Sequence, residues 1–214
     1  MSDARTDVLA RIRAALGPAP QAAVEVPRAY RAAGEHAPGS EAVLHLLEDR
    51  LVDYKAHVRR VSAAEVPDAI AQAVASLGTS APVVAPDGLD PAWIAGLGDV
   101  VLDSRTAPRS NAELDASAAV VTAARVAIAD TGTIVLDGEP DQGRRAITLV
   151  PDTHLCVVRA DQVVQTVPEA VRLLAEHAAR PQTWISGPSA TSDIELSRVE
   201  GVHGPRSLHV LLVV

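Results

Sequence analysis

Short apolar runs rich in β-branched residues alternate along this chain with longer stretches in which apolar residues recur every three or four positions. The runs are typical of strands buried on both faces of a sheet, and the stretches are typical of amphipathic helices. The candidate strands are 57–61, 82–85, 100–102, 118–122, 133–136, 154–158, 183–185 and 208–214. This alternation predicts a layered α/β domain with a largely parallel sheet flanked by helices.

Two capping boxes mark where helices begin. In Ser62-x-x-Glu65 and Thr166-x-x-Glu169, the hydroxyl and the carboxylate can each bond a free backbone N–H of the first helical turn. The first box precedes a stripe of apolar residues at helical spacing, namely Val66, Ala69, Ile70, Ala73, Val74 and Leu77. Further helices are expected from Ser40 onward and over residues 91–97.

The N-terminal region differs in composition from the rest. Residues 3–16 predict an amphipathic helix that Gly17-Pro18 ends, and residues 17–39 are rich in Pro and Ala without apolar periodicity. We therefore expect an N-terminal helical arm with its linker over 1–39 and a single α/β domain over 40–214. The arm either frays or docks on a partner or on a second copy of the chain, which would give a homo-oligomer.

Composition narrows the function classes. With no Phe, two Trp and two Tyr, the chain lacks the aromatic platforms that stack on bases, and its net charge of −8 disfavours nucleic acid and anionic membranes. No apolar run reaches the ~20 residues of a membrane span, and the polar start does not resemble a signal peptide, so a cytoplasmic protein is expected.

The chain is not expected to carry a cofactor. Its one cysteine, Cys156, allows neither an internal disulfide nor a protein-held iron–sulfur or cysteine–zinc site, and it is expected to be a buried thiol. Neither Gly-x-Gly-x-x-Gly nor a Walker A sequence is present, so nucleotide binding by those motifs is not predicted.

Two polar segments in the middle of the chain are candidates for ligand binding. Asp130, Thr131, Gly132 and Thr133 separate two apolar stretches, and such a turn can present amides and hydroxyls to an anion or can simply join two strands. Arg144 and its neighbour Arg145 follow the polar loop 138–143. Paired arginines can clamp a carboxylate or phosphate, or they can form a solvated rim.

A third group of candidates lies near the C-terminus. The polar stretches 186–195 and 201–206 carry Ser189, Thr191, Asp193, Glu195 and His203. They fit no zinc motif and no nucleophile elbow, so ligand hydrogen bonding or loop architecture is expected rather than metal binding. Because ligands collect at the carboxyl ends of strands in open α/β sheets, these loops and the 130–133 turn are predicted to share one pocket that binds a small anion. His154 is a further histidine of interest.

Four segments together resemble the LUD-domain family over about residues 40–214: 129–134, 149–154, 186–195 and 201–206, in this order. The resemblance implies a fold like that of the NagB/RpiA/CoA-transferase group. It also implies a role in oxidation of L-lactate to pyruvate beside cysteine-rich and iron–sulfur partner subunits, without a redox centre or an assigned catalytic residue on this chain. The alternative is a stand-alone enzyme or binding protein for a phosphorylated or CoA-linked metabolite.

Overall fold

A computed structural model describes residues 3–17, 25–27, 29–188 and 204–214. The chain divides into two compact units, Met1–Tyr30 and Arg31–Val214. The first unit contains helix α1 (Ala4–Leu16), which begins after the capping carboxylate of Asp3 and ends at Gly17. The predicted N-terminal helix is confirmed, and none of its residues is buried.

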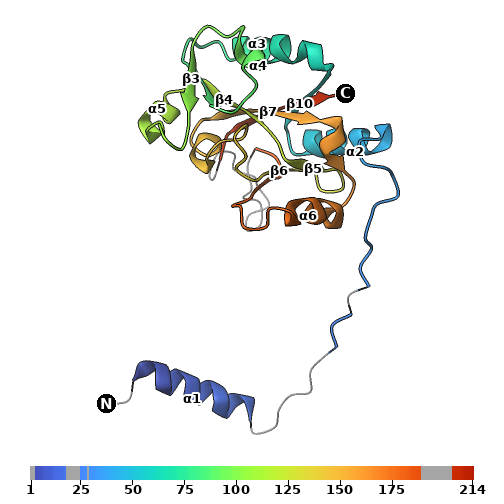
Figure 1. The fold of residues 1–214 in the computed structure, drawn as a ribbon, viewed down its shortest axis with the longest axis vertical. Coiled ribbons are helices and arrows are strands. Elements are labelled where there is room, and N and C mark those ends of the chain that lie inside the picture. Colours follow the sequence, from blue (N-terminus) through green and yellow to red (C-terminus); the bar gives the residue numbers. More distant parts are fainter. Residues whose placement is uncertain (1–2, 18–24, 28, 189–203) are drawn as a thin grey trace. The chain divides into compact units, whose positions relative to one another are not determined.

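The second unit is built on a six-stranded sheet in which every neighbouring pair of strands is parallel (Figure 1). Its strands, in spatial order, are β1 (His57–Val61), β10 (Ser207–Val213), β7 (Thr153–Arg159), β4 (Ala119–Ala123), β2 (Val83–Pro86) and β3 (Val100–Asp103). The last strand of the chain, β10, thus lies between β1 and β7. The predicted largely parallel sheet is confirmed.

A second sheet of four strands was not predicted. Its strands, in spatial order, are β8 (Val163–Val164), β5 (Val126–Ile128), β6 (Thr133–Leu136) and β9 (Thr183–Ile185). β5 pairs with β8 in parallel, but β6 is antiparallel to both β5 and β9. The sequence predicts β6 and β9 as strands, whereas β5 and β8 are too short to show a pattern of their own.

The helices cover the outer faces of both sheets and fill the space between them. They are α2 (Glu41–Asp53), α3 (Val66–Ser76), α4 (Pro91–Ile94), α5 (Asn111–Asp115) and α6 (Val167–Ala175), with short 3-10 turns η1 (Ala63–Glu65), η2 (Arg145–Thr148) and η3 (Ala160–Gln162). Both predicted capping boxes are confirmed, at η1 and at α6. α3 and α4 pack on one face of the six-stranded sheet, and α6 packs on the outer face of the four-stranded sheet (Figure 1).

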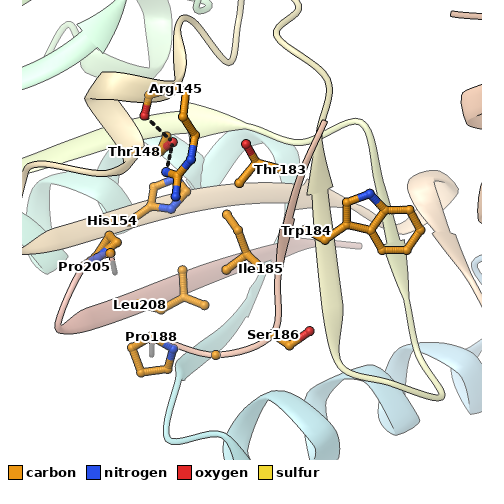
Figure 2. Close-up of a pocket in the computed structure, with 12 residues that line it drawn as sticks. Arg145, Thr148, His154, Thr183, Trp184, Ile185, Ser186, Pro188, Pro205 and Leu208 are labelled. Carbon is orange, nitrogen blue, oxygen red and sulfur yellow. Dashed lines mark hydrogen bonds between the residues drawn. The ribbon is translucent and has the colours of Figure 1, made fainter. Parts of the chain in front are cut away.

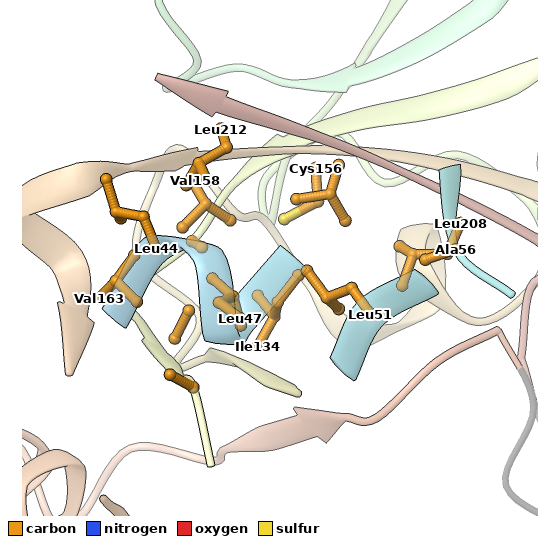
Figure 3. Close-up of a cluster of buried hydrophobic side chains, with 14 of the residues drawn as sticks. Leu44, Leu47, Leu51, Ala56, Ile134, Cys156, Val158, Val163, Leu208 and Leu212 are labelled. Carbon is orange, nitrogen blue, oxygen red and sulfur yellow. The ribbon is translucent and has the colours of Figure 1, made fainter. Parts of the chain in front are cut away.

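Helix α2 lies between the two sheets and forms the centre of the largest apolar cluster. Leu47 and Leu51 are completely buried, with strand residues of the large sheet on one side and Ile134 of the small sheet on the other (Figure 3). Cys156 belongs to this cluster and has no exposed surface, so the predicted buried thiol is confirmed. Each leucine buried in this way stabilises the fold by roughly 2–3 kcal/mol.

The last part of the predicted linker belongs to the second unit. The side-chain oxygen of Gln165 accepts hydrogen bonds from the backbone amides of Glu35, at 2.7 Å, and His36, at 3.0 Å. The Gly39 amide donates to the Val163 carbonyl at 2.9 Å. Gly34 lies so close that an added Cβ would be 2.2 Å from the Gln165 oxygen. Residues 34–39 therefore pack against the edge of the small sheet at β8.

Among the residues placed by the structure, no helix has the length and apolar character that crossing a membrane requires.

Candidate functional site

The adjacent arginines at the start of η2 have different surroundings. The Arg144 guanidinium binds the Asp103 carboxylate in a bidentate manner, with Nε donating to Oδ2 at 2.8 Å and Nη2 donating to Oδ1 at 2.7 Å. The Asp103 side chain is fully buried, and its hydrogen bonds raise the pKa of Arg144. The positive charge of Arg144 is thus balanced within the fold, at the carboxyl end of β3. A ligand-binding role for Arg144 remains a prediction.

Arg145 has no such counterion within the described part of the chain. Its Nη1 donates to the Thr148 hydroxyl at 3.1 Å, three residues further along η2, and it forms no ion pair there. Burial of part of the guanidinium lowers the pKa of Arg145, because desolvation disfavours the charged form. A partly desolvated cation without a carboxylate neighbour is suited to bind an anion.

His154 lies beside Arg145 at the start of β7 and is fully buried. Its Nε2 is 2.8 Å from the Thr122 hydroxyl on β4, whereas its Nδ1 has no hydrogen-bond partner among the described residues. Burial, together with the nearby charge of Arg145, lowers the pKa of His154 to about 4. The imidazole is therefore neutral at neutral pH and can both donate and accept a hydrogen bond.

These side chains line a pocket of about 80 Å³ between the two sheets (Figure 2). Figure 2 shows the Arg145 guanidinium next to the His154 ring, with Ile185 and Leu208 forming an apolar wall. The lining comes from η2, the starts of β7 and β10, all of β9, and the residues beside them: Arg145, Thr148, His154, Thr183, Trp184, Ile185, Ser186, Gly187, Pro188, Gly204, Pro205 and Leu208.

The position of this pocket differs from the predicted one. His154 and Leu208 stand at the amino-terminal ends of β7 and β10, whereas the sequence predicts a site at the carboxyl ends of the strands. The rule for open sheets assumes that helices cover both faces. Here the small sheet covers one face, and its edge strand β9 completes a pocket at the opposite end.

The predicted turn 130–133 joins β5 to β6, and its ligand-binding role stays a prediction. Gly132 has φ +58°, and an added Cβ would lie 2.8 Å from the Cβ of Arg50, so the turn needs glycine. Asp130 Oδ2 lies 3.9 Å from Arg31 Nη2. Thr133 Oγ1 lies 2.8 Å from the Thr131 hydroxyl and also 2.8 Å from the Ser186 hydroxyl. Through Ser186 the turn adjoins the pocket, although its own side chains do not line it.

Five predicted site residues lie outside the described residues, namely Ser189, Thr191, Asp193, Glu195 and His203. The residues that flank their segment, Gly187 and Pro188 before it and Gly204 and Pro205 after it, all line the pocket. Gly187 has φ +81°, and an added Cβ would be 2.7 Å from the Tyr54 Cβ. The prediction that these five residues share one site with the 130–133 turn stays a prediction.

Two polar partners in the pocket region, Thr122 and Thr148, were not predicted from the sequence. Thr122 stands in an apolar strand buried on both faces, where an isolated hydroxyl signals a buried hydrogen bond. Thr148 follows Arg145 at the three-residue spacing that brings side chains together on a helical turn. Both signals are local in the sequence, so the hydrogen bonds of both residues could have been predicted from it.

A wider neighbouring pocket of about 280 Å³ shares Arg145, Thr148 and Thr183 with the first. Its described lining also includes Arg105 and Arg144 and contains no carboxylate. Arg105 and Arg145 give the two pockets together a positive charge that no carboxylate of their described lining balances, in a chain whose net charge is −8. Among the described residues, no group of three or more His, Cys, Asp or Glu side chains is placed to hold a metal ion.

Comparison with known proteins agrees with this architecture. A crystal structure of a DUF162 family protein from Deinococcus radiodurans matches with a TM-score of 0.69 and 47% identity, covering 81% of this chain and 97% of that one. A lactate utilization protein C from the same species is 54% identical over 80% of this chain and 79% of its own length. Another from Anoxybacillus flavithermus is 30% identical over 92% and 93%, respectively.

The family model described as the LUD domain matches residues 44–213, which span both sheets from α2 to the end of β10. The predicted family resemblance is thereby confirmed. This chain belongs to the LUD-domain family.

Proposed function

We propose that this protein serves in lactate utilisation, as a cytoplasmic subunit without a redox centre in an iron–sulfur system that oxidises L-lactate to pyruvate. The observation that carries the proposal is the 54% identity to a protein named lactate utilization protein C, over four-fifths of this chain. The pocket of Arg145 and His154 supports it, because a guanidinium without a counterion and a neutral imidazole suit a small carboxylate.

The chemistry of the single cysteine supports a subunit that relies on partners for electron transfer. Iron–sulfur clusters are held by several cysteine thiolates, and this chain has only Cys156. That thiol is fully buried, and burial raises its pKa to about 12, so it is protonated and inaccessible. In the proposed system the clusters are carried by cysteine-rich and iron–sulfur subunits.

Deletion of the gene in its own organism tests the role. The proposal predicts loss of growth on L-lactate as the sole carbon source, retained growth on pyruvate, and rescue by the intact gene. Growth on L-lactate that is unaffected by the deletion would refute the role. Affinity purification from lactate-grown cells tests the partners, because cysteine-rich and iron–sulfur proteins should copurify, and fractionation should find all of them in the cytoplasm.

A second candidate function rests on the wider pocket. Arg105 and Arg145 line it without a carboxylate among the described lining residues, which suits the phosphates of a phosphorylated or CoA-linked metabolite. This alternative predicts that coenzyme A or a sugar phosphate raises the melting temperature more than pyruvate does. It also predicts that the deletion strain grows normally on L-lactate.

A further inference from the structure

The smaller pocket has the charge of an anion site. Arg145 contributes a guanidinium that pairs with no carboxylate among the described residues, and none of the described lining residues is Asp or Glu. Thr148 fixes the guanidinium through a 3.1 Å hydrogen bond, and most of its five N–H groups have no partner among the described residues. A carboxylate can accept two of these N–H groups at once.

His154 adds a second and independent sign of a ligand. Its Nδ1 is completely buried, lacks a partner in the described structure, and belongs to a ring that lines the same pocket. Buried polar atoms of native proteins are almost always hydrogen-bonded, so an isolated one in a pocket wall indicates a missing partner. The same ring is anchored by Thr122 at Nε2, which fixes its orientation.

The Thr122 hydroxyl allows either tautomer of the imidazole. It can donate its hydrogen to Nε2, 2.8 Å away, which leaves the ring hydrogen on Nδ1 as a donor. It can instead turn its hydrogen toward the Cys156 sulfur at 3.9 Å and accept from Nε2–H, which leaves Nδ1 as an acceptor. Nδ1 can therefore bond a keto oxygen or receive the hydrogen of a hydroxyl group.

We propose that Arg145 binds the carboxylate, and Nδ1 of His154 the neighbouring α-oxygen, of a small 2-oxo or 2-hydroxy acid. The inference rests on the proposed function and names the ligand class of its site. A cavity of about 80 Å³ has room for a ligand of a few carbon atoms. The apolar wall of Ile185 and Leu208 suits a methyl group such as that of pyruvate or L-lactate.

Calorimetric titration of the full chain with four probes tests this assignment. Pyruvate and L-lactate should bind, and propionate, which has the same carboxylate and methyl group but no α-oxygen, should bind at least tenfold more weakly. Inorganic phosphate should also bind at least tenfold more weakly than pyruvate. Equal affinity for propionate and pyruvate, or no binding of pyruvate at millimolar concentration, would overturn the proposal.

Two variants with the same chemical change locate the site. Arg145→Gln should weaken pyruvate binding at least tenfold, whereas Arg172→Gln, on the exposed side of α6, should leave it unchanged. If Arg145→Gln binds pyruvate normally, the ligand sits elsewhere and the proposal fails. If it lowers the melting temperature strongly and the parent binds no acid, Arg145 pairs within the chain and the proposal fails as well.

A measurement on the unmodified protein avoids any folding defect of a variant. The ¹⁵N resonance of Nδ1 in His154 should shift when pyruvate is added and stay in place with propionate. The absence of a shift at saturating pyruvate would contradict the contact between Nδ1 and the ligand.

The outcomes also separate this inference from the proposed role. Lost growth on lactate without acid binding would refute only the inference, and acid binding without a growth defect would refute only the role.

Discussion

Asp103 and Arg144 form an ion pair whose carboxylate is fully buried and whose guanidinium is about three-quarters buried. Removing one partner leaves the other charge desolvated and unpaired, which typically costs about 3–5 kcal/mol. Asp103→Asn should therefore lower the free energy of unfolding by about that amount in urea titrations. The matched change Asp161→Asn, in an exposed pair with Arg159, should cost less than about 1 kcal/mol. Similar costs for both variants would refute a structural role for the buried pair.

His154 should make stability depend on pH. Its pKa in the folded protein is about 4, below the ordinary value of 6.5, because burial and Arg145 disfavour the imidazolium. Between these values the unfolded chain binds a proton that the folded chain does not. The stabilising effect is therefore complete above about pH 6.5 and is lost as the pH falls toward 4, by up to about 3 kcal/mol.

Comparison of unfolding free energies at pH 7 and pH 4.5 isolates this effect. His154→Gln should lose less stability over this range than the parent, although it is less stable at pH 7. His45→Gln, at an exposed position of α2, should follow the parent. A pH dependence of His154→Gln equal to that of the parent would show that folding does not lower the pKa of His154.

Two deletions in the N-terminal region test which of its residues stabilise the second unit. The second unit begins at Arg31 and has its own core, so removal of residues 1–30 should leave its melting temperature nearly unchanged. Removal of residues 1–39 should lower stability by about 1–3 kcal/mol, because Gln165 loses two backbone donors and Val163 loses a third. Equal melting curves for the two deletions would show that residues 31–39 do not stabilise the second unit.

Light scattering tests the arm, because both deletions should weaken any association that α1 mediates.

Elements with both a start signal and a long apolar stripe were predictable from the sequence. The capping box at Ser62 and the apolar stripe after it predicted the helical segment of η1 and α3, and the capping box at Thr166 predicted α6. Helix α5 has an equivalent box, Ser110 with Glu113, but only one buried apolar residue, Leu114, follows it. A five-residue helix with one apolar contact shows no periodicity, and the same holds for β5 and β8.

The division of the strands into two sheets could not be predicted from the sequence. Strands of both sheets are buried on two faces, by α2 between them and by helices outside, so β4 and β6 show the same β-branched pattern. Only pairing partners distinguish them, and pairing is not local. The site also depends on strand pairing: Thr122 can bond His154 only because β4 and β7 are neighbours in the sheet. The sequence could therefore flag Arg145 and His154 separately but could not place them in one pocket.

Growth of a strain whose chromosomal gene encodes Arg145→Gln is the most direct test of the central claim, that this pocket serves lactate utilisation. We expect a growth defect on L-lactate approaching that of the deletion, normal growth on pyruvate, and protein levels equal to the parent by immunoblot. A strain with Arg172→Gln, the same charge change outside the pocket, should grow like the parent. Normal growth of the Arg145→Gln strain on L-lactate would contradict the account.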